Sequence, residues 1–96
     1  MKSIIILGST GSIGRSTLAI VESFPERFRV ATLAAGNNVD LAFEQAQRWQ
    51  PRWLATTDED SAEQLKHSSL PPGTKLVSGE DGIAAMVSDP ETDVVV

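Results

Sequence analysis

The stretch that decides the fold is Ile4-Ile5-Ile6-Leu7-Gly8-Ser9-Thr10-Gly11-Ser12-Ile13-Gly14. Its first four residues form a continuous and mostly β-branched run, which is typical of a strand covered on both faces, as in a parallel sheet. Three glycines follow at regular spacing, and apolar residues at helical spacing come next, up to the break at Pro25. A strand, a glycine-rich turn and a helix in this order indicate the first half of a βαβ unit with an anion site in the turn.

Each glycine of the turn has a separate expected role. Gly8 permits a sharp bend off the strand, Gly11 lets the backbone approach a pyrophosphate, and Gly14 lets the helix pack closely on the sheet. The backbone amides of residues 10–13 then point at the anion from the positive end of the helix dipole. The turn is therefore predicted to bind a dinucleotide.

Side chains of the turn can add to this site. The hydroxyls of Ser9, Thr10 and Ser12 can donate hydrogen bonds to a phosphate, and Arg15 could reach one, although an exposed helix arginine is more often only solvated. A P-loop NTPase is disfavoured, because no Gly-Lys-Ser or Gly-Lys-Thr closes the loop. A plain turn is the remaining alternative, but the position between a buried-type strand and a helix favours the dinucleotide interpretation.

Downstream of the turn, strand and helix patterns alternate. In the first helix, the residues at helical spacing are Ile13, Thr17, Ile20, Val21 and Phe24. We predict strands at residues 4–7, 28–35, 53–56, 75–77 and 94–96, helices at 13–24, 39–50, 59–67 and 80–87, and a surface loop at 68–74. Such alternation implies right-handed crossovers between parallel strands, so the expected fold class is α/β, a Rossmann-type doubly wound parallel sheet.

Bulk properties limit the organisation and the partners. A chain of 96 residues can bury one core, so residues 1–96 are expected to be one domain. The chain stops on Val96 within an apolar run, from which we expect an incomplete protein, truncated before its catalytic half. The net charge of −5 argues against nucleic acid as a partner, and the longest apolar run is too short for a membrane span. With no cysteine, a cytoplasmic protein is expected.

The choice of cofactor is predicted from the end of the second strand. NAD enzymes place an acid there on the ribose 2′-hydroxyl, whereas this chain has Ala34-Ala35-Gly36-Asn37-Asn38. No carboxylate would repel a 2′-phosphate and the Asn side chains can donate to one, which favours NADPH over NADH. The nearest acid, Asp40, falls in the first turn of the next helix, where it stabilises the helix dipole.

The other conspicuous residues have simpler structural explanations. His67 suits the carboxyl end of a helix, and Asp58-Glu59-Asp60 suits the cap of one better than a metal site. Trp49 and Trp53 are expected to cover the core. We assign no catalytic residue and no metal ligand in this chain.

Several stretches together resemble one enzyme family. Residues 8–14 (GSTGSIG), 25–30 (PERFRV) and 34–38 (AAGNN) closely resemble the start of the 1-deoxy-D-xylulose 5-phosphate reductoisomerases, and a looser resemblance covers the whole chain. In that family the positions that match contact NADPH. With Gly8 at the bend, the expected cofactor-binding residues are Gly8, Thr10, Gly11, Ser12, Ile13, Gly36, Asn37 and Asn38. Members of the family often carry a basic residue where this chain has Asn37.

The resemblance implies an NADPH-dependent oxidoreductase of non-mevalonate isoprenoid biosynthesis, of bacterial type. It rearranges and reduces 1-deoxy-D-xylulose 5-phosphate, a sugar phosphate, to 2-C-methyl-D-erythritol 4-phosphate. It also implies a divalent metal (magnesium, manganese or cobalt) bound by the catalytic part beyond Val96, and a homodimer as the full-length assembly. The chain alone is expected to be inactive. The alternatives are another NAD(P)-dependent reductase, such as a semialdehyde or homoserine-type dehydrogenase, and a non-catalytic nucleotide-sensing module.

Overall fold

A computed structural model describes residues 2–79, 82–84 and 93–96 of the chain. Strands and helices alternate along it as the sequence predicts. Their bounds are β1 Lys2–Leu7, α1 Ser12–Glu22, β2 Phe28–Ala35, α2 Val39–Trp49, β3 Trp53–Thr56, α3 Glu59–Lys66, β4 Lys75–Ser78 and β5 Val94–Val95. The helix predicted at 80–87 lies outside the described residues except for 82–84, which are helical.

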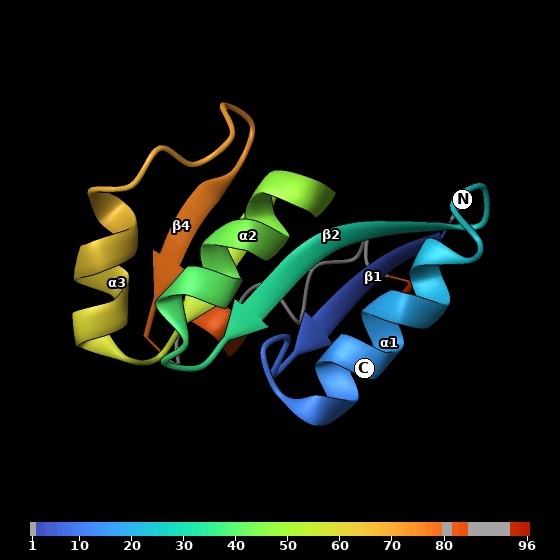
Figure 1. Cartoon of the computed structure of the whole chain (residues 1–96), viewed down its shortest axis with the longest axis horizontal. Coiled ribbons are helices and arrows are strands. Elements are labelled where there is room, and N and C mark those ends of the chain that lie inside the picture. Colours follow the sequence, from blue (N-terminus) through green and yellow to red (C-terminus); the bar gives the residue numbers. More distant parts are fainter. Residues whose placement is uncertain (1, 80–81, 85–92) are drawn as a thin grey trace.

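The described strands form one parallel sheet in the order β4-β3-β2-β1-β5. From β1 the sheet is built in one direction through β2 and β3 to β4, and β5 then pairs with the other side of β1. The helices α1, α2 and α3 connect β1 to β2, β2 to β3 and β3 to β4 (Figure 1). This reversal of direction confirms the doubly wound α/β class and places a topological switch point between β1 and β5.

The central strands β1, β2 and β3 carry buried residues on both faces of the sheet. Beneath the three helices, the main core contains Ile4, Ile6, Leu18, Val21, Val30, Leu33, Ala35, Ala42, Ala46, Leu54 and Leu65. A smaller cluster on the opposite face joins Ala34 and Ala55 to Trp53, Val77 and Ile83. Trp49 packs against the main core and Trp53 against the smaller cluster, so the prediction that both tryptophans cover the core is confirmed.

A β-bulge decides which side of β2 faces the helices. Ile4 pairs with Val30 but Ile5 pairs with Thr32, so Ala31 is an extra residue in β2. Val30 and Leu33 therefore lie in the same core, three positions apart instead of two or four. Nothing in the run of small and apolar residues indicated this irregularity.

The predicted apolar face of the first helix is partly wrong. Ile13 is 78% exposed, Ile20 is 60% exposed and Phe24 is exposed, whereas the buried residues of α1 are Gly14, Leu18 and Val21. Those three lie at i, i+4 and i+7, which is a narrower stripe than the sequence pattern indicated. The helix also ends at Glu22, because the amides of the next two residues bond to carbonyls only three positions back.

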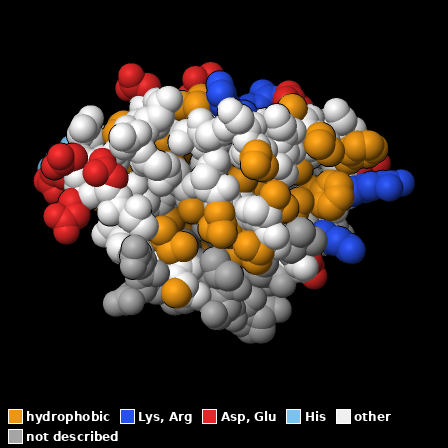
Figure 2. Space-filling view, turned by 90° about the horizontal axis from the view of Figure 1, so that it is seen from below, with side chains coloured by type: hydrophobic (Ala, Val, Ile, Leu, Met, Phe, Trp, Pro, Cys, Tyr) orange, Lys and Arg blue, Asp and Glu red, His pale blue; other side chains and the backbone are white. Residues whose placement is uncertain are grey.

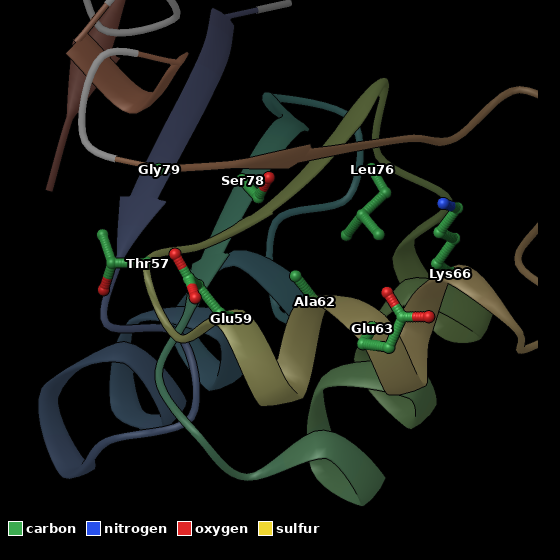
Figure 3. Close-up of a pocket in the computed structure, with 8 residues that line it drawn as sticks. All are labelled: Thr57, Glu59, Ala62, Glu63, Lys66, Leu76, Ser78 and Gly79. Carbon is green, nitrogen blue, oxygen red and sulfur yellow. The ribbon is translucent and has the colours of Figure 1, made fainter.

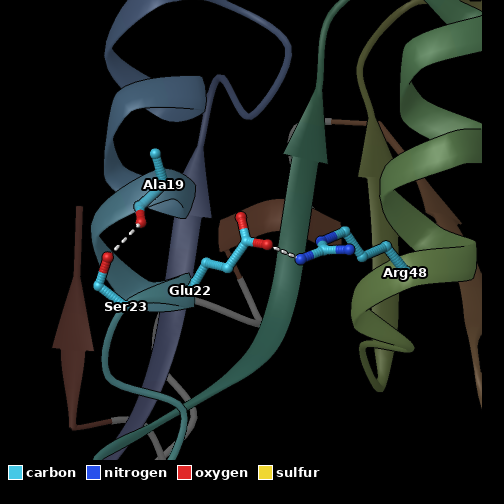
Figure 4. Close-up of polar contacts among 4 residues, drawn as sticks. All are labelled: Ala19, Glu22, Ser23 and Arg48. Atoms are coloured by element: carbon cyan, nitrogen blue, oxygen red, sulfur yellow. Dashed lines mark hydrogen bonds and ion pairs between the residues drawn. The ribbon is translucent and has the colours of Figure 1, made fainter.

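One ion pair links the outer ends of α1 and α2. Arg48 on α2 pairs with Glu22 on α1, and Ser23 Oγ donates to Ala19 O at 3.3 Å within the end of α1 (Figure 4). Both charged side chains are more than half exposed, so the pair is expected to contribute only about 0–1 kcal/mol to stability. It joins the two helices at the end away from the glycine turn.

Candidate functional site

The glycine turn leaves the carboxyl end of β1, next to the switch point. Leu7 N–H donates to Val96 O, so β1 and the chain after β5 run side by side up to the bend. In open parallel sheets, ligands bind outside the carboxyl ends of the strands at such a point. Seen from below, hydrophobic side chains gather across part of the described surface, and charged ones lie toward its edges (Figure 2).

Two of the glycines are required by the backbone. Gly8 has φ +67°, a left-handed conformation that favours glycine, and its carbonyl accepts from Gly11 N at 3.0 Å. At Gly14, a Cβ atom would lie 2.2 Å from Gly8 O and 2.6 Å from Ser9 Cα. The expected role of Gly8 is confirmed. The close packing at Gly14 is confirmed as well, although its partner is the backbone of the turn.

Gly11 differs from the other two. Its φ of −83° is open to any residue, and a Cβ there would meet only Gly8 O, at 3.4 Å, which is ordinary contact. The fold itself therefore tolerates a side chain at this position. Its missing side chain leaves the exposed face of the turn open, as the close approach of a phosphate requires.

The start of α1 is unlike the starts of α2 and α3. Gly11 occupies its N-cap without a side-chain hydrogen bond, and no acid lies in its first turn. By contrast, Asn38 caps α2 through Leu41 N, and Asp58 caps α3 through Ser61 N. The first amides of any helix lack intrahelical acceptors, so those at the exposed start of α1 are free to bind an anion.

The structure brings the two predicted cofactor segments together. Gly36 N–H donates to Thr10 Oγ1 at 3.4 Å, which joins the glycine turn to the end of β2. Gly36, Asn37 and Asn38 are exposed next to the turn. Asn38 uses its Oδ1 to cap α2, at 3.2 Å from Leu41 N, so its amide nitrogen keeps its two donors. The sites at residues 8–13 and 36–38 are therefore one continuous surface.

The expected role of the Ser9 hydroxyl as a phosphate donor is wrong. Ser9 is 0% exposed, and its side-chain oxygen is buried with no hydrogen-bond partner in the part of the chain that the structure describes. Its backbone is held on both sides: Ser9 N–H donates to Ala34 O at 2.9 Å, and Ser9 O accepts from Gln45 Nε2 at 2.8 Å. Ser9 is thus the buried anchor of the turn, and the exposed hydroxyl is that of Ser12.

Two supporting residues were missed from the sequence. Gln45 lies behind the turn, and Thr56 Oγ1 donates to Gly36 O at 3.1 Å from the end of β3. A signal for Gln45 was present, because it falls between Ala42 and Ala46 in the buried stripe of α2. Polar residues inside such a stripe usually have a buried partner. Thr56 carries no comparable signal.

The remaining candidate residues have structural roles, and Arg15 lies beside the glycine turn. Arg15 is exposed and its Nε donates to Gly11 O at 3.4 Å, while Asp40 lies in the first turn of α2. Asp58 caps α3, and His67 contacts Glu63 at 2.9 Å. In the part of the chain that the structure describes, no three His, Asp or Glu side chains gather as a metal ion needs. Nor does any helix there have the length and apolar character needed to cross a membrane.

A hollow of about 560 Å³ lies between α3 and β4, at the edge of the sheet away from the glycine turn (Figure 3). Its walls combine charged residues of α3 with residues of β4 and the turns around them. They are Thr57, Glu59, Ala62, Glu63, Lys66, Leu76, Ser78 and Gly79. None of the predicted cofactor residues belongs to it, so this hollow is separate from the candidate site.

A parallel sheet whose switch point carries a glycine turn and an uncapped helix start defines the class of Rossmann-type dinucleotide-binding domains. Comparison with known families agrees. The model of the 1-deoxy-D-xylulose 5-phosphate reductoisomerase family matches residues 4–96. The chain belongs to this family. Membership favours the reductoisomerase interpretation over the semialdehyde and homoserine-type dehydrogenases.

Individual relatives carry the same name. The reductoisomerase of Glaesserella parasuis is 44% identical over 97 residues, and one from Synechococcus sp. (strain CC9311) is 44% identical over 104 residues. These matches cover 99% and 100% of this chain but 24% and 25% of the relatives. The chain therefore spans about a quarter of their length.

Solved structures give the same result for the fold. A DOX-P reductoisomerase in complex with NADPH, fosmidomycin and magnesium has a TM-score of 0.85 at 33% identity, over 99% of this chain and 24% of that one. The enzyme from Zymomonas mobilis, in complex with NADPH, has a TM-score of 0.79 at 28% identity, over 88% of this chain and 22% of that one.

Proposed function

We propose that this chain is the NADPH-binding part of a 1-deoxy-D-xylulose 5-phosphate reductoisomerase. The observation that carries the proposal is the hydrogen bond from Gly36 N to Thr10 Oγ1. It joins the segment expected to bind the pyrophosphate to the segment expected to bind the ribose 2′-phosphate. Relatives of this family were solved with NADPH bound. The same surface in this chain has the free amides and the open backbone that a pyrophosphate needs.

Each segment has its own part in binding. The amides at the start of α1 hold the pyrophosphate, and the absence of a side chain at Gly11 lets it come close. The ribose 2′-phosphate lies beside Asn37 and Asn38, where no carboxylate repels it. When bound, NADPH supplies the hydride for reduction of the substrate. The chain's own residues hold and orient the cofactor.

The rest of the activity is proposed from the family. The substrate is a sugar phosphate, the site of action is the bacterial cytoplasm, and the full-length protein is a homodimer. The described residues do not fit a divalent metal, because no cluster of ligands occurs among them. We therefore place magnesium, manganese or cobalt on other residues of the full-length protein.

Paired titrations test the proposal. NADPH is expected to bind at least about tenfold more tightly than NADH, the equivalent of about 1.4 kcal/mol, because the site lacks the acid that would hold a free 2′-hydroxyl. Binding is followed by the change in nicotinamide fluorescence. Equal or tighter binding of NADH would overturn the proposed cofactor, and no binding of either would overturn the site.

A further inference from the structure

Gln45 is a buried polar residue directly behind the glycine turn. It lies on α2, is 7% exposed, and donates from Nε2 to Ser9 O at 2.8 Å across 36 residues of sequence. Because a carbonyl oxygen only accepts, the amide must present its nitrogen to Ser9, which fixes its orientation. Gln45 therefore ties the second helix to the first turn of the fold.

The side chain of Gln45 gives its donor to the turn and leaves its own acceptor unpaired. Gln45 Oε1 is buried with no partner among the described residues, and so is Ser9 Oγ. A buried acceptor without a hydrogen bond is a cost to folding. A leucine or methionine in the same place between Ala42 and Ala46 would leave no side-chain acceptor unpaired, but it would remove the donor that Ser9 O accepts from. The donor of Gln45 therefore serves the backbone carbonyl of Ser9.

The geometry of one peptide group shows what that carbonyl controls. The described chain has no cis peptide, so the C=O of Ser9 and the N–H of Thr10 point in opposite directions in one plane. Since Gln45 holds Ser9 O toward α2, Thr10 N–H points away from α2. No described residue accepts a hydrogen bond from it, although the Thr10 side chain is engaged with Gly36.

We propose that Gln45 is a positioning residue of the anion site. It holds the Ser9–Thr10 peptide so that the Thr10 N–H faces the pyrophosphate of the dinucleotide. In the flipped orientation the Ser9 carbonyl would face the anion and repel it. The identity of the ligand rests on the proposed function, whereas the anchored peptide is a feature of this chain.

The experiment compares two glutamines of the same helix. Gln47 Nε2 also donates to a backbone carbonyl, Ser69 O, at 2.8 Å, but on the exposed side and away from the turn. Gln45→Met is expected to weaken NADPH binding about tenfold, because the Thr10 N–H would no longer be held toward the charged pyrophosphate. Gln47→Met is expected to leave NADPH binding unchanged. Both variants are made in the protein as the cell produces it, and melting temperatures confirm that they fold.

A second ligand separates positioning from general damage. Adenosine 2′-phosphate lacks the pyrophosphate, so Gln45→Met should bind it as the wild type does. Equal loss for both ligands, or no loss of NADPH affinity in folded Gln45→Met, would overturn the inference while the proposed function stands. Failure of the wild type to bind NADPH would overturn both.

A measurement on the wild-type protein tests the proposal even if the Gln45 variant does not fold. The amide resonance of Thr10 in the wild-type protein is expected to shift and to exchange more slowly with solvent when NADPH is added. A Thr10 amide that is indifferent to NADPH, in a protein that binds it, would count against the anchored peptide.

Discussion

Gly11 and Gly14 stand three residues apart and have opposite reasons for lacking a side chain. At Gly14 a Cβ would overlap the backbone of the turn, at 2.2 Å from Gly8 O. At Gly11 the nearest atom would be at 3.4 Å and the backbone is unstrained. The fold therefore requires glycine at position 14 but not at position 11, where we propose that the open space serves the pyrophosphate.

Gly11→Ala is expected to weaken NADPH binding by at least about tenfold with little change in stability, because the methyl group stands where the pyrophosphate approaches. Isothermal titration measures the affinity and thermal melting the stability. The control is Gly73→Ala in a surface loop, where a Cβ meets nothing within 4 Å. Unchanged affinity in Gly11→Ala would show that no ligand comes close to this turn.

Gly14→Ala is expected to destabilise the fold by about 2 kcal/mol. Alanine is the better helix former by about 1 kcal/mol, but forced overlap with backbone atoms in a packed site costs more than that. Urea unfolding gives the free energy. Ser16→Ala, at an exposed position of α1, should be neutral or slightly stabilising. If Gly14→Ala proves as stable as the wild type, the close packing of α1 on the turn is wrong.

At the scale of elements, the N-termini of the helices differ in how they are capped. The described starts of α2 and α3 are closed by side-chain caps, and that of α1 is not. Asn38 caps α2 and also lies in the segment that Gly36 joins to Thr10, beside the candidate cofactor site. Asp58 caps α3 and has no such position.

Asn38→Ala and Asp58→Ala therefore form a matched pair. Each is expected to lower the free energy of unfolding by about 1 kcal/mol, as loss of an N-cap does. Only Asn38→Ala should also weaken NADPH binding, because it removes a donor beside the 2′-phosphate. Chemical denaturation and NADPH titration of both variants check this. An equal effect of the two on NADPH affinity would mean that Asn38 acts through stability alone.

For the whole molecule, the sheet order brings the site to one end of the domain. The switch point between β1 and β5 lies at the glycine turn, while the hollow between α3 and β4 lies at the other edge. Leu7, Val95 and Val96 are each 42% exposed near the switch point. The described part thus offers a surface for a cofactor and no assembled set of metal ligands.

The 96-residue chain by itself is accordingly expected to show no reductoisomerase activity. Rearrangement of a hydroxy-ketone needs its two oxygens held and polarised, which a divalent cation on oxygen ligands can do. The measurement follows NADPH absorbance with 1-deoxy-D-xylulose 5-phosphate and magnesium or manganese, against a blank without protein. Substrate-dependent oxidation that a chelator abolishes would contradict this prediction.

The amino-acid sequence by itself determined the order of elements, the parallel class and the glycine turn. These depend on local signals: a β-branched run, glycines at set positions, and breaks such as Pro25 and Pro51. Seven of the eight predicted cofactor residues are exposed and the eighth, Thr10, is partly so, and the contact between Thr10 and Gly36 joins their two segments. Their contact with NADPH stays a prediction.

Only the tertiary structure decided which side chains of these elements are buried. Ile20 looked like a core residue but is exposed, and Ser9 looked like a ligand but is buried, because burial depends on how α1 and α2 lie on the sheet. The bulge at Ala31 arises in the pairing of β1 with β2, and the hydrogen bond from Gln45 to Ser9 O joins α2 to the glycine turn. Both features depend on segments that are far apart in sequence. Local propensity carries no information about such contacts, since they exist only once the sheet and its helices have packed.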